Sequence, residues 1–400
     1  MSFDHLLTLE AQEFIRLHLG DDVAQLALRA RQYPDLPLTD LIRQIQARQK
    51  ARTKLPTWCA NDRVVFPVIL SLEQCSSETT ATYKASLWSG DTLVDLTGGL
   101  GVDTFFFAKH FKQVIHVEQN SELSALAAHN FRELGADNIT CLNEDSTAFL
   151  AGMASKVDAI YLDPARRDRA NGKVFRLDDC EPDVLQLLPL LLDKAHTVLL
   201  KTSPMLDIDL AVQQLKGVQA VTVVAVENEC KEVLYQLSAQ PTEVPALTAT
   251  NLLKNGQADT FTFSKRAEQQ AEATFSEALT YLYEPNAALL KAGAFQSVAQ
   301  RFGLNKLHLH THLYTSETLQ PDFPGRIFRC EAVMKLDKKA LLAYLPEGKA
   351  NLTVRNFPMS VADIRRQTGI REGGEMYLFA TTDLHNRKVI IVTQKVDLFS

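Results

Sequence analysis

The sequence predicts an α/β protein built on an open, parallel sheet. Apolar runs of strand length alternate with helical stretches between residues 91 and 240. The run at 92–96 enters a glycine-rich turn, Gly98-Gly99-Leu100-Gly101, and helix-compatible residues follow. Glu118 and Asp163 stand at the ends of later strand-like runs. Because open α/β sheets bind ligands at the carboxyl ends of their strands, we expect a site there.

Length and composition describe a globular chain of several domains. The 400 residues are 46% hydrophobic and 22% charged, and such a length suggests about two to four domains. No apolar run is long enough to cross a membrane and no signal-peptide pattern is present, so we expect a cytoplasmic protein without membrane insertion. Six cysteines without a Cys-x-x-Cys pair indicate reduced thiols rather than disulfides or zinc. The net charge of -6 disfavours a generic nucleic-acid binder but leaves room for a local basic groove.

Residues 1–88 are predicted to be mainly helical, with apolar spacing that indicates helices over 6–19, 23–30 and 38–51. A loop and a short apolar strand are expected over 58–70, and a helix ending near Trp88 follows. A basic cluster lies at the end of the third helix. A solvated helix face is the favoured interpretation, and a phosphate-contacting patch is the alternative. The cluster consists of Arg43, Arg48, Lys50, Arg52 and Lys54.

The central sheet is predicted from strands near 92–96, 114–118, 139–142, 159–162 and 197–201. Two further β-rich runs, 219–226 and 232–237, are separated by a short polar link without a helix, which is typical of antiparallel partners. Residues 240–265 read as additional strands or a linker.

The glycine turn suggests the kind of ligand. A pyrophosphate binder usually has a third glycine, but Val102-Asp103-Thr104 follows Gly101 here. An acid at the helix start repels phosphate and tolerates the cationic sulfonium and amino group of S-adenosylmethionine, and Asp95 favours the same ligand. Glycine turns also arise merely to pack a helix on a strand. The predicted cofactor-binding residues are Asp95, Thr97, Gly99, Gly101 and Asp103 at the turn, Glu118 for the ribose and Asp145 for the adenine.

Four motifs carry a closer resemblance: Ser76-Ser77-Glu78-x-Thr80-Ala81-x-Tyr83-Lys84, the turn from Asp95 to Asp103, Asp163-Pro164-Ala165-Arg166-Arg167, and Asn356-Phe357-Pro358. The turn resembles class I S-adenosylmethionine-dependent methyltransferases. Over nearly its full length the chain resembles a bacterial family in which that domain is followed by small ferredoxin-like and THUMP-like domains. In the family the lead-in before Trp88 lies against the cofactor, so Glu78 and Lys84 are candidates for closing its pocket, with structural capping as the alternative.

The resemblance implies a Rossmann-like class I methyltransferase sheet, with an N-terminal helical region and C-terminal ferredoxin-like and THUMP-like α+β domains. The expected boundaries are 1–88 for the helical region, 89–240 for the methyltransferase domain, 241–325 for a linker and the ferredoxin-like domain, and 326–400 for the THUMP-like domain. THUMP domains are associated with RNA-modifying enzymes, so the resemblance also implies RNA as a partner.

Asp163, Pro164 and Arg166 are the predicted catalytic residues. An acid and the backbone carbonyls near Pro164 can accept hydrogen bonds from an exocyclic amine and orient it for methyl transfer. Enzymes that methylate planar amines often have a second proline and then an aromatic residue, whereas this chain has Ala165 and Arg166. Stacking on a base would then come from the Arg166 guanidinium or from Phe175.

The same loop also resembles RNA 5-methyluridine methyltransferases, which attack the base with a cysteine placed after the next strand. This chain has Lys201-Thr202-Ser203-Pro204 there. Because no thiol is available at this place, methylation of a uridine carbon is disfavoured. Lys201 and Ser203 are candidates for lining the substrate pocket, with a structural turn as the alternative. Arg167 and Phe175 are further substrate candidates within a basic loop, for which phosphate contact and a solvated loop both remain open.

The C-terminal part is expected to begin with a helix over 267–282 and to end as a compact α+β module, with strands at 325–333, 350–355, 375–381 and 388–393 and helices at 338–345 and 360–367. Alternation places His308, His310 and His312 on one strand face. A metal there is considered, but an exposed polar face is favoured, and no metal is expected. Arg355, Arg365, Arg366 and Arg371 form either a second RNA-facing patch or solvated positions.

These patterns together predict a cytoplasmic S-adenosylmethionine-dependent methyltransferase that acts on a nucleobase in RNA. Two alternatives stay open: a methyltransferase for a protein or a small molecule, and a non-catalytic RNA-binding scaffold that keeps the fold.

Overall fold

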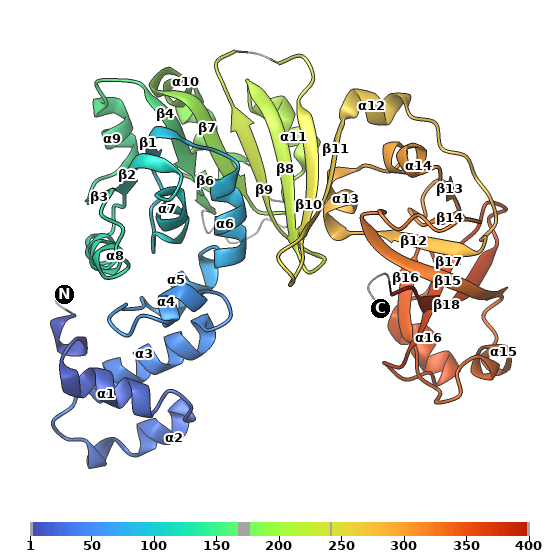
Figure 1. Cartoon of the computed structure of the whole chain (residues 1–400), viewed down its shortest axis with the longest axis horizontal. Helices are drawn as coiled ribbons and strands as arrows, with labels where there is room; N and C mark the ends of the chain where they lie inside the picture. Colours follow the sequence, from blue (N-terminus) through green and yellow to red (C-terminus); the bar gives the residue numbers. More distant parts are fainter. Residues whose placement is uncertain (1–2, 167–176, 241, 398–400) are drawn as a thin grey trace. The chain divides into compact units, whose positions relative to one another are not determined.

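The computed structural model describes residues 3–166, 177–240 and 242–397, and the chain forms two compact units (Figure 1). The first unit comprises Met1–Gln219 and Lys231–Thr242, and the second comprises Ala220–Cys230 and Glu243–Ser400. Within the described residues, no helix has the length and apolar character needed to cross a membrane.

The N-terminal region is helical, as predicted. Its 3-10 helices are η1 (Asp4–Leu6) and η2 (Ala30–Gln32), and its α-helices are α1 (Leu9–Leu17), α2 (Val23–Leu28), α3 (Leu38–Ala51), α4 (Pro56–Cys59), α5 (Ile69–Gln74) and α6 (Glu78–Ser86). The strand expected within 58–70 is wrong, because residues 60–68 contain no strand and α4 and α5 lie on either side. Pro56 starts α4, a position where a backbone N–H would have no partner within the helix, so its absence loses no hydrogen bond. The Glu78 carboxylate accepts hydrogen bonds from the N–H groups of Thr57 and Trp58 at 2.7 and 3.3 Å. Glu78 thus has a structural capping role.

The basic cluster after α3 is largely structural. Arg48 is buried and donates hydrogen bonds to the carbonyl oxygens of Asp62 and Val64 at 2.6 and 2.7 Å. Lys50 pairs with Glu73 at 2.8 Å. Lys50 fits the solvated helix face, since its side chain is largely exposed and paired. Arg48 fits neither interpretation, because it is buried and its guanidinium is used by backbone carbonyl oxygens.

The sheet of the first unit has the strand order β9-β7-β4-β1-β2-β3. Adjacent strands from β7 to β3 are parallel, and β9 runs antiparallel to β7, which confirms the predicted strands and a reversed strand after the last parallel one. The bounds are β1 (Gly90–Asp95), β2 (Phe111–Val117), β3 (Ile139–Leu142), β4 (Val157–Leu162), β7 (Ala195–Thr202) and β9 (Glu229–Leu237).

Helices separate the parallel strands, and a short ribbon follows β4. The helices are α7 (Val102–Phe107), α8 (Ser121–Glu133), α9 (Ser146–Gly152), α10 (Val184–Lys194) and α11 (Ile208–Gln214). The ribbon pairs β5 (Ala165–Arg166) antiparallel with β6 (Cys180–Glu181), and the 3-10 helix η3 (Leu177–Asp179) precedes β6. The ribbon therefore brings the chain after residue 176 back beside the end of β4.

The N-terminal helices and the sheet share one apolar core. Leu41 and Ile45 of α3 are buried in the same cluster as Leu93 of β1, and α6 leads from these helices directly into β1 (Figure 1). Trp58 packs edge-on against Phe105 of α7, with ring centroids 6.1 Å apart. Burial of such large apolar side chains stabilises the fold by about 2 kcal/mol each. The helical region is thus an integral part of the unit that carries the sheet.

The second unit begins with β8 (Val218–Val226), which pairs parallel with β10 (Ala246–Leu252), and β10 pairs antiparallel with β11 (Ala258–Ser264). Residues 240–265 are therefore mainly strands, one of the two alternatives left open. A separate sheet has the order β13-β14-β12-β15-β18-β17-β16. The strands of this sheet are β12 (Tyr281–Pro285), β13 (Asn305–Lys306), β14 (Tyr314–Ser316), β15 (Gly325–Met334), β16 (Asn351–Arg355), β17 (Met376–Thr382) and β18 (Lys388–Lys395). The helices of the second unit are α12 (Lys265–Gln270), α13 (Ala287–Ala292), α14 (Ser297–Phe302), α15 (Lys338–Ala343) and α16 (Val361–Thr368).

The alternation of the last module is confirmed, but the helix predicted over 267–282 is wrong. Helix α12 ends at Gln270, and β12 begins at Tyr281 between β14 and β15. Tyr281 and Tyr283 have high strand propensity, and pairing on both sides stabilises the strand over a continued helix.

The three histidines do not share a strand face, so this prediction is also wrong. His308, His310 and His312 lie in the turn between β13 and β14. The His312 ring stacks on Phe295 with centroids 3.8 Å apart, and no group of three metal-ligating side chains is present in the part of the chain that the structure describes.

Candidate active site

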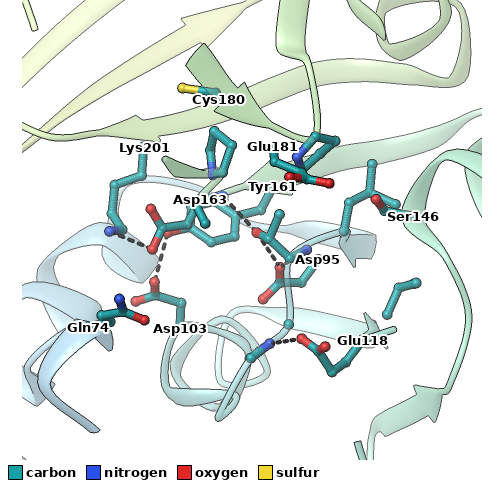
Figure 2. Close-up of a pocket in the computed structure, with 18 of the residues that line it drawn as sticks. Gln74, Asp95, Asp103, Glu118, Ser146, Tyr161, Asp163, Cys180, Glu181 and Lys201 are labelled. Carbon is teal, nitrogen blue, oxygen red and sulfur yellow. Dashed lines mark hydrogen bonds and ion pairs between the residues drawn. The ribbon is translucent and has the colours of Figure 1, made fainter. Parts of the chain in front are cut away.

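A pocket of about 860 Å³ opens at the carboxyl ends of β1, β2, β4 and β7 (Figure 2). Every predicted catalytic, cofactor-binding or substrate-binding residue whose side chain the structure describes lines this pocket, whereas Glu78 and Lys84, the candidates for closing it, do not. The individual roles of the lining residues stay predictions. Arg166 is described only by its backbone in β5, and Arg167 and Phe175 lie outside the described residues. The lining residues from the predicted set are Asp95, Thr97, Gly99, Gly101, Asp103, Glu118, Asp145, Asp163, Pro164, Lys201 and Ser203.

The glycine turn is shaped by close packing beneath it. A Cβ atom at Gly98 would lie 2.3 Å from the His116 ring, and one at Gly101 would lie 2.3 Å from the Phe131 ring. Gly99 and Gly101 have φ values of +55° and +85°, a backbone conformation that residues other than glycine rarely adopt. Burial lowers the pKa of His116 to about 4, so the ring beneath the turn is neutral. The glycines therefore serve helix packing and also leave bare backbone on the pocket side.

Glu118 ties the end of β2 to this turn. One carboxylate oxygen accepts the Gly99 N–H at 2.9 Å, and the other accepts the Asn120 N–H at 2.7 Å. Each oxygen keeps a second lone pair, so the half-buried carboxylate can still accept hydroxyl groups from a ligand. Asp145 caps α9 by accepting the N–H groups of Thr147 and Ala148 at 3.0 and 2.9 Å, and it too keeps acceptor capacity at the pocket wall.

Asp95 is buried at the end of β1. Its carboxylate accepts hydrogen bonds from the Thr97 N–H at 3.0 Å and the Thr104 hydroxyl at 2.7 Å. Burial raises the pKa of Asp95 to about 7, and these hydrogen bonds partly oppose the shift. The Thr97 hydroxyl in turn accepts the Asp163 N–H at 2.7 Å. The hydrogen-bonded series Asp95–Thr97–Asp163 joins the glycine turn to the loop after β4.

The Asp163 side chain forms an ion pair with Lys201 at the end of β7. Lys201 Nζ lies 2.6 Å from Asp163 Oδ2. Burial acts to lower the pKa of Lys201, but nearby carboxylates, Asp163 first, raise it above its usual value, so the group stays an ammonium. The other oxygen, Oδ1, has no partner among the described residues, and the side chain is 31% exposed. Within the described part of the chain, Asp163 is therefore held at one oxygen and can accept a hydrogen bond at the other.

Several pocket residues had no local sequence signal. Gln74 and Cys75 come from the end of α5, and Cys180, Glu181 and Asp183 come from the returning β6 segment. They reach the pocket through the α5–α6 lead-in and the β5–β6 ribbon, and no motif in the sequence includes these five residues themselves. The family motif that begins at Ser76 was the one available hint for the first of these walls.

The pocket fits S-adenosylmethionine on two grounds. Its volume of about 860 Å³ lies within the usual range for small-molecule and cofactor sites. Asp95, Asp103, Glu118 and Asp145 make its wall acidic around a bare glycine turn, which favours a cationic, hydroxyl-bearing ligand over a pyrophosphate. The parallel sheet, the reversed strand β9 and this site define the class I methyltransferase fold.

Comparison with known proteins identifies the remaining parts of the chain. Residues 281–324 match the profile of a ferredoxin-like domain, and residues 325–395 match that of a THUMP domain-like family. A crystal structure of a Porphyromonas gingivalis W83 protein, to which methyltransferase activity has been ascribed, is 34% identical with a TM-score of 0.88, and the match covers 99% of this chain and 100% of that one. The chain belongs to this family of S-adenosylmethionine-dependent methyltransferases with appended ferredoxin-like and THUMP-like domains.

A curated relative matches over a shorter region. Ribosomal RNA small subunit methyltransferase J of Coxiella burnetii (strain Dugway 5J108-111) is 29% identical over 125 residues, which is 28% of this chain and 49% of that protein. The chain thus spans about half the length of this relative.

The first prediction concerns the turn. Gly101→Ala should lower the free energy of unfolding by about 2–4 kcal/mol, because the new methyl group meets Phe131 and the φ value is unfavourable. It should also weaken binding of S-adenosylhomocysteine, measured by titration calorimetry. Gly135→Ala is the matched control, since Gly135 has φ +71° and open space around it, and should cost about 1 kcal/mol without affecting ligand binding. Equal effects of both variants on binding would contradict this role of Gly101.

The second prediction concerns Asp95. Its pKa of about 7 in the folded state exceeds the value of about 4 in the unfolded chain. Between these values the folded state binds more protons, so this group lowers stability as pH rises from about 4 to about 7. Asp95→Asn removes the titration. Its free energy of unfolding relative to the wild type should therefore rise by about 2–4 kcal/mol across that window, measured by urea unfolding at each pH. A difference that does not change with pH would contradict the raised pKa.

Proposed function

We propose that this protein transfers a methyl group from S-adenosylmethionine to a nucleobase in RNA. The observation that carries the proposal is the arrangement of Asp163. Its backbone is held by Thr97 and one carboxylate oxygen by Lys201, while the other oxygen, which has no partner among the described residues, lies in a pocket beside the glycine turn. A cytoplasmic location is part of this proposal.

In this proposal S-adenosylmethionine, when bound, supplies an electrophilic methyl carbon. The backbone at Gly99 and Gly101 would hold its methionine end together with Thr97, Asp95 and Asp103. Glu118 would accept the ribose hydroxyls, and Asp145 would accept from the adenine edge. These assignments follow from the positions of the residues around the pocket and from their free acceptor capacity.

Asp163 Oδ1 would accept a hydrogen bond from an exocyclic amine of the base. Such a hydrogen bond would orient the amine so that its nitrogen lone pair faces the methyl carbon of the cofactor. Orientation of this kind accounts for much of the rate enhancement in bimolecular transfer reactions. The Lys201 ammonium keeps Asp163 in one rotamer. Pro164 and Arg166 complete the loop, and Ser203, Arg167 and Phe175 remain the proposed substrate contacts.

The substrate class is supported by two comparisons. The curated relative acts on ribosomal RNA by its name, and the C-terminal module matches a THUMP domain-like family. The net charge of -6 favours the alternative of a protein or small-molecule substrate. A scaffold that keeps the fold without catalysis is the remaining alternative, and the experiments below separate these possibilities.

The test is transfer of labelled methyl from S-adenosylmethionine into total RNA from a strain that lacks the protein, with a protein extract in parallel. We expect label in RNA with the wild type. Asp163→Ala should lower kcat by at least about 100-fold with little change in cofactor affinity, because an orienting contact is lost. Asp158→Ala is the matched control: this aspartate lies on the same strand at the opposite end, where it accepts the N–H groups of Asp91 and Thr92, and kcat should persist.

Other outcomes of the assay have defined meanings. Label in protein instead of RNA would replace the RNA substrate by a protein substrate. No label anywhere, despite measured cofactor binding, would favour the scaffold. RNA binding should also weaken steeply with salt, because each phosphate contact releases a counterion. An affinity that does not depend on salt would contradict a nucleic-acid substrate.

A further inference from the structure

A buried lysine connects the segment before the sheet to the pocket. Lys84, the last residue of the family motif that starts at Ser76, lies on α6 and is 0% exposed. Its Nζ lies 3.0 Å from Ser76 Oγ, 3.0 Å from Glu232 Oε2 on β9 and 3.1 Å from Asp103 Oδ1 on α7. Lys84 does not line the pocket itself, whereas Asp103 does. The expectation that Lys84 closes the pocket thus becomes a question about what it does through Asp103.

Asp103 is held in the pocket wall by protein groups. Its Oδ2 accepts hydrogen bonds from the Tyr161 hydroxyl at 2.7 Å and from the Ser76 hydroxyl at 2.9 Å, and the side chain is only 10% exposed. Burial acts to raise the pKa of Asp103, but the ammonium groups of Lys84 and Lys201 and the hydrogen bonds lower it overall. Asp103 is therefore a buried carboxylate that needs a cation.

Two ammonium groups serve three carboxylates in this cluster. Lys201 pairs with Asp163, and Lys84 pairs with Asp103 and Glu232. Lys201, Asp103 and Asp163 line the same pocket, and Glu232 and Asp103 act with Asp163 to raise the pKa of Lys201. Asp103 and Glu232 therefore attract the same ammonium that holds Asp163. An unpaired buried charge is strongly unfavourable, and removal of Lys84 would leave Lys201 as the remaining lysine in the cluster.

We propose that Lys84 is a positioning residue for methyl transfer, which pairs with Asp103 and Glu232 and thereby leaves Lys201 paired with Asp163. Lys84 touches neither the pocket nor Asp163, so it acts through the distribution of charge in the cluster. The segment from Ser76 to Lys84, outside the sheet, thus sets the orientation of the predicted catalytic carboxylate. The kinetic consequence rests on the proposed function, whereas the arrangement of ion pairs does not.

The test is Lys84→Met, which keeps the length of the buried stem and removes the charge. In a crystal structure of this variant we expect Lys201 Nζ to leave Asp163 and approach Asp103. The wild-type separation of 2.6 Å between Lys201 Nζ and Asp163 Oδ2 is the reference. At saturating S-adenosylmethionine, kcat should fall by about 100-fold, as expected for a misplaced reacting group. Cofactor affinity should fall less, because Asp103 keeps its hydrogen bonds from Tyr161 and Ser76.

The double variant Lys84→Met/Asp103→Asn provides the rescue. It removes one of the two carboxylates that compete for Lys201, so Lys201 should return to Asp163. Because Asp103 is also a proposed cofactor contact, kcat is measured at saturating S-adenosylmethionine, where it should recover by about tenfold over the single variant. Lys306→Met is the matched control for loss of a buried lysine. Lys306 is 2% exposed in the second unit, where it donates to the Leu309 carbonyl at 3.1 Å, and kcat should be unchanged.

Each outcome bears on the proposal. An unchanged Lys201–Asp163 pair in Lys84→Met would overturn it, and so would a double variant that regains thermal stability but no activity, since that result describes a purely structural role. If the wild type methylates no RNA, the proposed function fails while the crystal structures still decide whether Lys84 keeps Lys201 on Asp163.

Discussion

The hydrogen bonds from Thr97 to Asp95 and from Asp163 to Thr97 connect the two halves of the site. Asp95 ends β1 and Asp163 follows β4, and the backbone and hydroxyl of one threonine link them. Because Asp95 is buried, its carboxylate needs both Thr97 and Thr104 as partners. The same contacts that satisfy a buried acid therefore set the distance between the glycine turn and the loop that carries Asp163. These hydrogen bonds thus join the predicted cofactor wall to the predicted catalytic carboxylate.

The N-terminal helices belong to this piece as well. Trp58 packs on Phe105 in the core of the sheet domain, and Glu78 caps the helix that carries Trp58. Lys84 then places a cation between α7 and β9. Without α6 the sheet would leave Asp103 and Glu232 without this counterion, so the helical region contributes to the charge balance beside the pocket.

Much of the first unit was predictable because its signals are local. Buried parallel strands read as apolar runs, the turn residues need left-handed backbone, and acids follow strands whose carboxyl ends meet at one edge. Prediction was wrong where partners are distant. The sequence around Tyr281 is compatible with the end of a helix, but in the structure Tyr281 lies in a strand that pairs with β14 and β15. The residues from His308 to His312 alternate in the manner of a strand, although they form a turn. Short apolar or alternating stretches leave helix, strand and turn unresolved without such partners.

The sequence by itself determined the fold class, the positions of the central strands and many of the residues that line the pocket at their carboxyl ends, since these depend on periodicity and on residue types at strand ends. Only the tertiary structure decided how their charges are paired. That Lys201 binds Asp163, that Lys84 binds Asp103 and Glu232, and that Arg48 binds backbone carbonyls depends on contacts between segments far apart in the chain. Ion pairs of this kind leave no periodic pattern in the sequence. A long, flexible lysine or arginine side chain can pair with any acid that packing brings within about 4 Å.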